Sequence, residues 1–341
     1  MTEQDQDATL LSALIRLGVV PRGAHPRITA LEGGVSSDIR LVELNGMRVC
    51  VKRALPRLKV AQLWEAPISR NGHEWAWFEV AGAICPGSVP KLIARDADAG
   101  LFAMAYLEPA QYKLWKAQLR DGIAEPATAA AVGERLARIH NATADRADLA
   151  ARFATDAGFH AIRLEPYLLA AARAHPARAA ALGALVETTA AMRRVLVHGD
   201  VSPKNILIGP DGPVFLDAEC AWFGDPAFDL AFCLNHLLLK CLWNQAAAKR
   251  FLDCFESLAG RYLQLAAWEA PEALECRAAR LLPGLLLARV DGKSPVEYIT
   301  AERDKNRVRR LARRFLAYPA TRLAEVSQAW RDQIWHEGTT T

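Results

Sequence analysis

A stretch in the second half of the chain carries side chains suited to phosphoryl transfer. Residues 197–207 read VHGDVSPKNIL, and residues 214–219 read VFLDAE. We expect a loop that presents Asp200 and Asn205, followed by a strand end that presents Asp217. Transfer of a phosphoryl group from ATP needs oxygen ligands for divalent cations, and a carboxylate that orients and deprotonates the acceptor hydroxyl. Asp200 suits the carboxylate role, and the oxygens of Asn205 and Asp217 suit Mg²⁺.

Two strand-like runs must position this loop, although the pattern around them is helical. They cover residues 195–200 and 205–219, and the second contains an Asp-Gly pair typical of a hairpin. Between them, His198 and Gly199 would position the loop. A strand-end turn without chemistry is the alternative interpretation, and the hairpin with Asp217 at its end favours the catalytic one.

Together these motifs resemble the aminoglycoside phosphotransferase and choline kinase family, small-molecule kinases with a protein-kinase-like two-lobe fold. The resemblance covers nearly the whole chain. It implies that Asp200 is the catalytic base and that Asn205 and Asp217 are the metal ligands. Asp229, in GDPAFDLAF, is similar to the family aspartate that braces the catalytic loop. Independently, Asp225–Pro226 predicts an N-cap and a first-turn proline, and so a helix that starts there.

The sequence pattern changes near residue 108. Before it, short β-type runs are separated by turn formers, with one helical stretch over residues 70–81. After it, the pattern is mostly helical. The helical segments are 126–144, 165–193, 226–265, 269–288, 300–317 and 320–335. We therefore expect an α+β, two-lobed, protein-kinase-like fold. Residues 1–108 would form a small β-rich nucleotide-binding lobe, and residues 109–341 a larger helical lobe with the catalytic loop, metal site and acceptor pocket.

The strand MRVCVK carries the residue expected to bind the ATP phosphates. Alternation places Cys50 and Lys52 on one strand face and the two valines on the other. Lys52 resembles the family lysine that reaches the α- and β-phosphates, with Cys50 lining the roof of the adenine pocket. Glu74 looks like the helix glutamate that pairs with this lysine, and Glu79 is the competing candidate.

Two further segments would contact the nucleotide. The turn LEGGVSSD would cover the phosphates with backbone N–H groups and hydroxyls, although a Gly-Gly pair between strands can also be only a tight turn. The contacting residues would be Gly33, Gly34, Ser36 and Ser37. LFAMAYLEP resembles the family hinge. With Met104 as gatekeeper, backbone groups of Ala105 and Leu107 would hold the adenine edge.

Within the family, the methylthioribose kinase branch resembles this chain most. The shared features are the run KRALPRLKVAQLWEAPISRN and an Asp-x-Glu pattern, which makes Glu219 a candidate second metal-site carboxylate or, equally, a salt-bridged structural residue. Two features depart from the branch. Its catalytic loop reads HGDLHTGS where this chain has HGDVSPKN, and its arginine pair is replaced by Ala288–Arg289. We therefore expect a changed acceptor pocket, in which methylthioribose is a poor substrate.

The acceptor is expected to be a small polar metabolite, with a sugar or sugar-like hydroxyl compound favoured. Arg289, Asp291 and Lys293 would face it, unless they form only a polar helix end. Residues 302–315 hold seven Lys and Arg against two Asp and Glu. They form either a solvated helix face or a positive wall for an anionic acceptor. Methylthioribose kinase proper, an antibiotic phosphotransferase with an acidic pocket, and a nucleotide-binding pseudokinase scaffold are the alternatives.

Composition limits the remaining function classes. The 341 residues are 52% hydrophobic and 23% charged with a net charge of +4, which is typical of a globular protein and too mild for a nucleic-acid binder. The N-terminal residues are acidic, unlike a signal peptide. Seven cysteines without a C-x-x-C pair predict reduced thiols. We expect a cytoplasmic monomer or homodimer that uses ATP and Mg²⁺ and binds no membrane.

Overall fold

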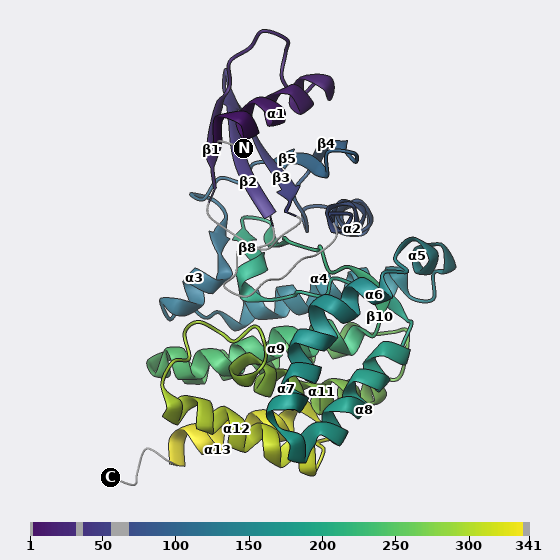
Figure 1. Cartoon of the computed structure of the whole chain (residues 1–341). Helices are drawn as coiled ribbons and strands as arrows, with labels where there is room; N and C mark the ends of the chain where they lie inside the picture. The colour runs from purple at the N-terminus through teal and green to yellow at the C-terminus, as the bar shows by residue number, and fades with distance from the viewer. Residues whose placement is uncertain (1–2, 32–36, 56–67, 337–341) are drawn as a thin grey trace. The chain divides into compact units, whose positions relative to one another are not determined.

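The computed structural model describes residues 3–31, 37–55 and 68–336. The chain forms two compact units, Met1–Gln111 and Tyr112–Thr341 (Figure 1), which divide close to the position where the sequence pattern changes. Each unit has its own secondary structure and core.

The N-terminal unit is built on a five-stranded antiparallel sheet with the strand order β1-β2-β3-β5-β4. Its elements are α1 (Glu3–Arg16), β1 (Arg27–Ala30), β2 (Ser37–Leu44), β3 (Met47–Ala54), α2 (Arg70–Ile84), β4 (Leu92–Asp96) and β5 (Leu101–Ala105). The Asn-Gly turn predicted from the sequence joins β2 to β3. Asn45 and Gly46 have φ angles of 49° and 84°, and Leu44 pairs with Met47 across the turn. These positive φ angles are those of the tight hairpin turns that Asn-Gly favours.

The two faces of β3 pack against different partners. Val49 and Val51 lie in a buried cluster with Leu10 and Leu14 of α1. On the other face, Lys52 contacts α2. Successive side chains point to opposite faces of a strand, which explains both contacts. The valines bury the apolar face of α1, and Lys52 lies on the other face of the strand.

The C-terminal unit is mostly helical. Its main helices are α3 (Trp115–Arg120), α4 (Pro126–Thr143), α5 (Ala147–Arg152), α6 (Asp156–Phe159), α7 (Ala170–Ala174), α8 (Ala179–Ala191), α9 (Pro226–Trp243), α10 (Ala248–Leu265), α11 (Pro271–Asp291), α12 (Glu302–Ala317) and α13 (Leu323–His336). Helix α9 forms the centre of this unit (Figure 1), because it packs against both α10 and α11 and almost all of its residues are buried. It starts as predicted, with the Asp225 side chain accepting from the Ala227 N–H at 3.0 Å and Pro226 in the first turn.

Short strands in the C-terminal unit hold the catalytic loop. β7 (Val195–Val197) pairs with β10 (Trp222–Gly224), and β8 (Ile206–Gly209) pairs with β9 (Gly212–Phe215). A two-residue strand, β6 (Lys113–Leu114), pairs with β8. The predicted hairpin is present and Gly209 pairs with Gly212, so its turn is Pro210–Asp211. The loop between β7 and β8 is therefore anchored at both ends.

The helix predicted over residues 165–193 is interrupted in the structure. A π-helix spans His160–Leu169 and leads into α7, and a short 3-10 turn at Pro176–Arg178 separates α7 from α8. Two prolines give the physical reason. Pro166 has no N–H to donate to an α-helical ladder, and Pro176 disfavours a helical conformation of His175, whose φ and ψ are −129° and 70°. Such wide turns are often found at functional sites.

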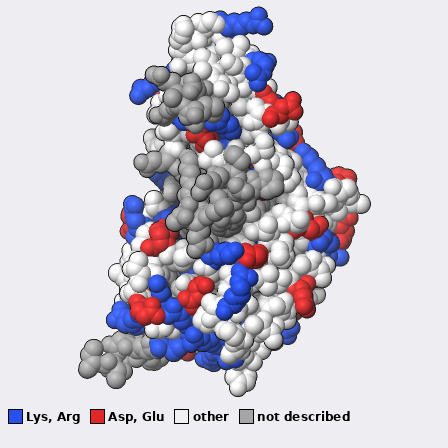
Figure 2. Space-filling view, in the orientation of Figure 1, with Lys and Arg blue, Asp and Glu red and all other residues white. Residues whose placement is uncertain are grey.

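The visible surface carries both signs of charge. Figure 2 shows Lys and Arg as well as Asp and Glu among the described residues of this face. Of the helices in the described ranges, none has the length and apolar character needed to span a bilayer.

Candidate active site

Asp229 fixes the backbone of the catalytic loop. Its two carboxylate oxygens accept the N–H groups of His198 at 2.7 Å and Gly199 at 2.8 Å. The side chain is fully buried in the first turn of α9, and His140 Nε2 of α4 lies 3.4 Å from Oδ2. A buried carboxylate with two N–H partners holds both residues in place, because releasing either N–H would leave a buried donor unpaired.

Gly199 adopts a backbone conformation that other residues disfavour. Its φ is +79°, and a Cβ at this position would lie 2.6 Å from the Cys220 carbonyl oxygen. Both the left-handed conformation and this close approach require glycine. The glycine of the H-G-D motif therefore allows the loop to pack against the segment that follows β9.

His198 ties the loop to the end of β9. Its Nδ1 accepts the Asp200 N–H at 3.1 Å, so the proton lies on Nε2, which is 3.1 Å from the Leu216 carbonyl and donates to it. Burial lowers the pKa of His198, although the carboxylates of Asp229, Asp200 and Asp217 oppose this. A neutral imidazole in this tautomer positions Asp200 relative to the strand end that carries Asp217.

The Asp200 carboxylate is buried, and its two oxygens differ in their partners. Oδ2 lies 2.9 Å from Arg163 Nη2 and 3.1 Å from Lys204 Nζ. Within the described residues, Oδ1 has no hydrogen-bond partner. The Lys204 side chain stays half exposed, and the Asp200 and Asp217 carboxylates raise its pKa. Among the described residues, Oδ1 is therefore left as a buried hydrogen-bond acceptor.

Arg163 was not identified from the sequence. It lies on the π-helix, where it contacts Asp200 and also donates from Nε to the Gly199 carbonyl. Burial opposes its charge, but the Asp200 carboxylate outweighs this effect and raises the pKa of the guanidinium. The one available signal was a single arginine among apolar residues in HAIRLEPYLL. A charged group that is buried in such a segment requires a partner.

The residues predicted to bind metal lie at the end of the β8–β9 hairpin. The Asn205 carbonyl accepts the Leu216 N–H at 2.8 Å, and Asn205 Nδ2 donates to the Asp200 carbonyl at 3.1 Å. This pairing places Asn205 across from the residue that precedes Asp217. Asp217 has a φ of 65°, a left-handed conformation that costs a non-glycine residue about 1–2 kcal/mol. Strain of this kind is typical of functional positions.

Glu219 is half-buried two residues beyond Asp217, as the Asp-x-Glu pattern requires. No cluster of three or more His, Cys, Asp or Glu side chains suited to a metal ion occurs in the described part of the chain. Carboxylate and amide oxygens on neighbouring strand ends fit Mg²⁺, which usually takes only one or two protein carboxylates and completes its shell with phosphates and water.

In the N-terminal unit, Lys52 pairs with Glu74. Lys52 Nζ lies 2.8 Å from Oε1 and 2.7 Å from Oε2, and both side chains are buried. Glu79, the competing candidate, is exposed on α2. Asn71 Nδ2 donates to the Lys52 carbonyl at 3.3 Å and so holds α2 against β3.

The remaining nucleotide candidates are described only in part. Gly33, Gly34 and Ser36 lie outside the described residues. Ser37 is buried at the start of β2, and Cys50 pairs in register with Met104 of β5. Burial raises the pKa of the Cys50 thiol to about 12, so this side chain is a neutral apolar group. The Ala105 N–H donates to the Lys91 carbonyl at 2.8 Å, which leaves the Ala105 carbonyl and the half-buried Leu107 as the hinge candidates.

Two of the three residues predicted to face the acceptor have structural partners. Asp291 accepts from Arg309 Nη2 at 2.7 Å and lies 2.8 Å from His175, and Lys293 pairs with Glu165 at 2.9 Å. Arg289 differs, because it is buried and donates to neutral groups, the Tyr167 hydroxyl and the carbonyl and hydroxyl of Ser294. It contacts no carboxylate in the described residues. We therefore keep only Arg289 as an acceptor candidate.

The basic segment 302–315 forms most of α12, an amphipathic helix that packs on α11. Arg303, Arg310, Arg313 and Arg314 are exposed on it. Arg309 binds Asp291 and Glu302, and Arg307 lies 3.4 Å from Asp304. This arrangement favours a solvated helix face that is anchored by ion pairs.

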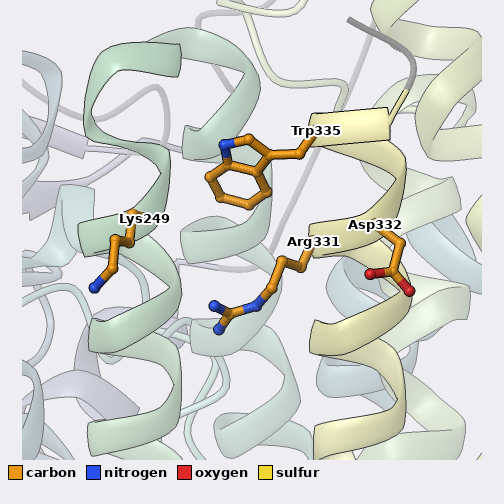
Figure 3. A pocket seen from close by; sticks show the side chains of 4 residues that line it. All are labelled: Lys249, Arg331, Asp332 and Trp335. Carbon is orange, nitrogen blue, oxygen red and sulfur yellow. The ribbon is translucent and has the colours of Figure 1, made fainter. Parts of the chain in front are cut away.

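A surface pocket of about 340 Å³ lies between α10 and α13 (Figure 3), away from these residues in the sequence. It is lined by Lys249, Arg331, Asp332 and Trp335. Lys249 pairs with Asp253 and Arg331 with Glu256, so its charged groups are engaged by neighbours. Because these charged groups are paired, we do not assign the pocket a catalytic role.

Substitution of Asp229 tests the support of the loop. Asp229→Ala leaves the N–H groups of His198 and Gly199 unpaired, and each buried unpaired donor costs about 1–3 kcal/mol. We expect the free energy of unfolding to fall by about 2–6 kcal/mol in urea denaturation. Asp253→Ala, which removes an exposed ion pair with Lys249, is the control and should change stability by less than about 1 kcal/mol. Equal losses in both variants would contradict the bracing role.

Comparisons with known proteins show the family and the fold of this chain. A family model described as "Phosphotransferase enzyme family" matches residues 27–260. A methylthioribose kinase of Erwinia tasmaniensis is 25% identical over 339 residues, covering 90% of this chain and 76% of that protein. A methylthioribose kinase of Yersinia pseudotuberculosis serotype O:3 is 27% identical over 236 residues, covering 61% of this chain and 58% of that protein. The chain thus spans little more than half the length of several curated relatives that it matches.

Two solved structures share the fold. One is titled as an amicoumacin kinase in complex with AMP-PNP, Ca²⁺ and Ami, with a TM-score of 0.58, 12% identity and coverage of 96% of this chain and 100% of that one. The other is an ethanolamine kinase from Plasmodium vivax, with a TM-score of 0.58, 11% identity and coverage of 97% and 91%. These likenesses confirm the expected α+β, protein-kinase-like fold class.

Proposed function

The chain belongs to the phosphotransferase enzyme family and is a small-molecule kinase, and we propose that it transfers the γ-phosphoryl group of ATP to a hydroxyl of a small polar metabolite. A sugar or sugar-like acceptor is favoured. The observation that carries the proposal is the buried Asp200, whose Oδ2 is held by two cations while Oδ1 has no partner within the described residues. A carboxylate fixed in this way can orient an acceptor hydroxyl and take its proton.

Asn205 and Asp217 are the proposed metal ligands, with Glu219 as the candidate second carboxylate. A divalent cation bound with ATP neutralises the charge of the phosphates during transfer. The protein's own part is to fix the ligands, through the Asn205–Leu216 hydrogen bond and the constrained backbone of Asp217. Lys52, oriented by Glu74, would bind the phosphates of ATP by its ammonium group.

A reducing compartment suits the cysteines of this chain. All seven are free thiols, and six of them are buried. We propose the cytoplasm as the location, since free thiols persist there in the reduced form.

Methylthioribose kinase proper is the second candidate, because the curated relatives reported above carry that name. Against it, the loop reads HGDVSPKN, and Ala288, which is fully buried, stands in place of one arginine of the pair found in that branch. An uncharged acceptor is recognised through hydrogen bonds, and each lost partner costs about 1–3 kcal/mol, or roughly 5- to 150-fold in binding. The losses in binding from two such changes multiply.

Acceptor-dependent ADP release tests the proposal directly. The panel contains pentoses, polyols, methylthioribose, amino alcohols and a kanamycin-type aminoglycoside, each assayed with MgATP. We expect turnover with a hydroxyl compound of the sugar type, and a kcat/KM for methylthioribose below about 10⁴ M⁻¹s⁻¹. A value for methylthioribose above this level and above every other acceptor would assign the chain to that branch. Preference for the aminoglycoside would favour antibiotic phosphorylation, and nucleotide binding without ADP release with any acceptor would favour a pseudokinase.

A further inference from the structure

One face of the central helix α9 carries an unusual set of side chains. Phe232, His236, Lys240 and Trp243 follow at spacings of four, four and three residues, which places them on the same side of the helix. Lys240 is only 1% exposed and His236 only 5%. Long cationic side chains are almost never this buried unless they are paired.

Lys240 has aromatic partners instead of an acidic one. Its Nζ lies 4.1 Å from the centroid of the Trp243 ring and 4.0 Å from that of Tyr298, and the two rings stack at 4.5 Å. Within the described ranges, Lys240 forms no ion pair. The nearby Glu297 pairs with Lys116, and both of these side chains are partly exposed, so the buried face borders solvent there. Cation–π contacts compensate only part of the cost of a buried charge.

Arg289 adds a second cation to this uncompensated positive region. His236 adds a neutral ring, because burial lowers its pKa. Arg289 Nη1 lies 3.2 Å from the Tyr167 hydroxyl and 3.1 Å from Ser294 Oγ, which are neutral groups. Three buried polar atoms here have no hydrogen-bond partner in the described part of the chain. They are Arg289 Nε, His236 Nε2 and the Tyr298 hydroxyl.

Other half-buried arginines of the same unit are neutralised by carboxylates. Arg277 contacts both Asp225 and Glu269, and Arg309 contacts both Asp291 and Glu302. The absence of such partners for Lys240 and Arg289, within the described residues, is therefore a local feature. A buried cation without an anion is costly, and the missing anion can be supplied by a ligand.

This positive region is continuous with the catalytic aspartate. Arg163, which binds Asp200, has its guanidinium 5.7 Å from the ring centroids of Tyr167 and Phe232. The Phe232 ring lies 5.5 Å from the His236 ring, and the Arg289 guanidinium lies 5.5 Å from the Tyr167 ring. A row of buried groups thus leads from the proposed base to Lys240.

We propose that the acceptor of this kinase carries an anionic group, a carboxylate or a phosphate, which binds Lys240 and Arg289 while the hydroxyl to be phosphorylated lies at Asp200. The proposal rests on the proposed function, and it names the substrate class. His236 and Tyr298 supply further hydrogen bonds to the same group. The structure also disfavours a quaternary ammonium acceptor, because the Lys240 ammonium already occupies the aromatic faces that would bind one.

The titration of Lys240 fits this role. Burial, together with the nearby charges of Lys116 and Arg289, lowers its pKa to about 7, although Glu297 opposes this shift. The folded pKa is lower than that of an exposed lysine, so the charged form destabilises the fold below about pH 7, and stability rises as the pH increases from there towards 10. A bound anion stabilises the ammonium and reverses this cost. A lysine whose only role was to stabilise the fold would not destabilise it in the charged form.

Matched acceptors and matched lysine variants test the proposal. Thermal shift and calorimetry are measured with D-glycerate and D-ribonate, with D-ribose 5-phosphate, with glycerol and ribitol, and with choline. ADP release is measured with the same compounds. The proteins are the wild type, Lys240→Met, and Lys249→Met as a control on the exposed surface of α10. The carboxylates and the phosphate are separate arms, which distinguish the two kinds of anionic group.

We expect at least one anionic compound to raise the Tm of the wild type and of Lys249→Met, and to bind at least about tenfold more tightly than its neutral counterpart. Lys240→Met should lose this preference, and its own Tm without ligand should equal or exceed that of the wild type. A lower Tm for Lys240→Met, with no anion-dependent shift in the wild type, would show that the lysine is structural and overturn the proposal. Turnover of neutral or cationic acceptors above their anionic counterparts would also overturn it, while leaving the kinase function intact. ADP release from no compound, despite anion binding at Lys240, would instead contradict the proposed function.

Discussion

Asp200→Asn is expected to lower kcat by about 10²–10⁴-fold, which is the usual contribution of a positioned general base. The affinity for MgATP should change by no more than about threefold, because Asp200 acts on the acceptor hydroxyl and its Oδ1 is the atom without a partner among the described residues. Asparagine keeps the size of the side chain and an oxygen for Arg163 or Lys204. Steady-state kinetics and calorimetric titration with nucleotide measure the two quantities separately.

Asp253→Asn on α10 is the control for a lost carboxylate charge, since its carboxylate pairs with the exposed Lys249 on the surface of the helix. It should keep wild-type kcat. Wild-type turnover in Asp200→Asn would remove Asp200 from the role of base. An equal loss of nucleotide affinity and of kcat would indicate that the residue binds ATP instead.

Asp217→Ala is expected to abolish the Mg²⁺ dependence of ATP binding. Loss of a group that supports a metal ligand costs about 10–100-fold in metal affinity, and loss of the ligand itself should cost at least as much. The substitution relieves little of the backbone strain at this position, because the left-handed conformation is unfavourable for alanine as well. Calorimetric titration of ATP in Mg²⁺ and in EDTA gives the difference.

Asp211→Ala, in the exposed turn of the same hairpin, is the matched control and should bind MgATP normally. If the two variants kept the same Mg²⁺ dependence, Asp217 would not be a metal ligand. Asn205 and Glu219 would then be the remaining candidates.

The sequence predicted those features that depend on local chemistry. The Asn45–Gly46 hairpin follows from the positive φ angles that these residues tolerate, and the start of α9 follows from an acidic N-cap before proline. Alternation along β3 predicted that Lys52 would lie on the face away from the two valines, and the structure places Lys52 against α2. In each case a few neighbouring residues determine the backbone conformation or the strand face on which a side chain lies.

Features that depend on tertiary packing could not be predicted in the same way. Glu74 and Glu79 lie five residues apart on α2, so they point about 140° apart around the helix, and the face that meets the sheet decides between them. Arg163 reaches Asp200 from a π-helix that starts before the helix expected over residues 165–193. Lys240 lies in a nearly continuous apolar run, where the sequence gives no sign that the charge is buried without an acidic partner.

The most direct test of the central claim is ³¹P NMR of the reaction mixture, with the wild type and Asp200→Asn compared on the same acceptor panel. The account predicts that the wild type converts ATP to ADP together with a new phosphate-ester signal from the acceptor, and that Asp200→Asn forms this ester about 10²–10⁴-fold more slowly. ADP accompanied only by inorganic phosphate, or ester formation at the wild-type rate in Asp200→Asn, would contradict it.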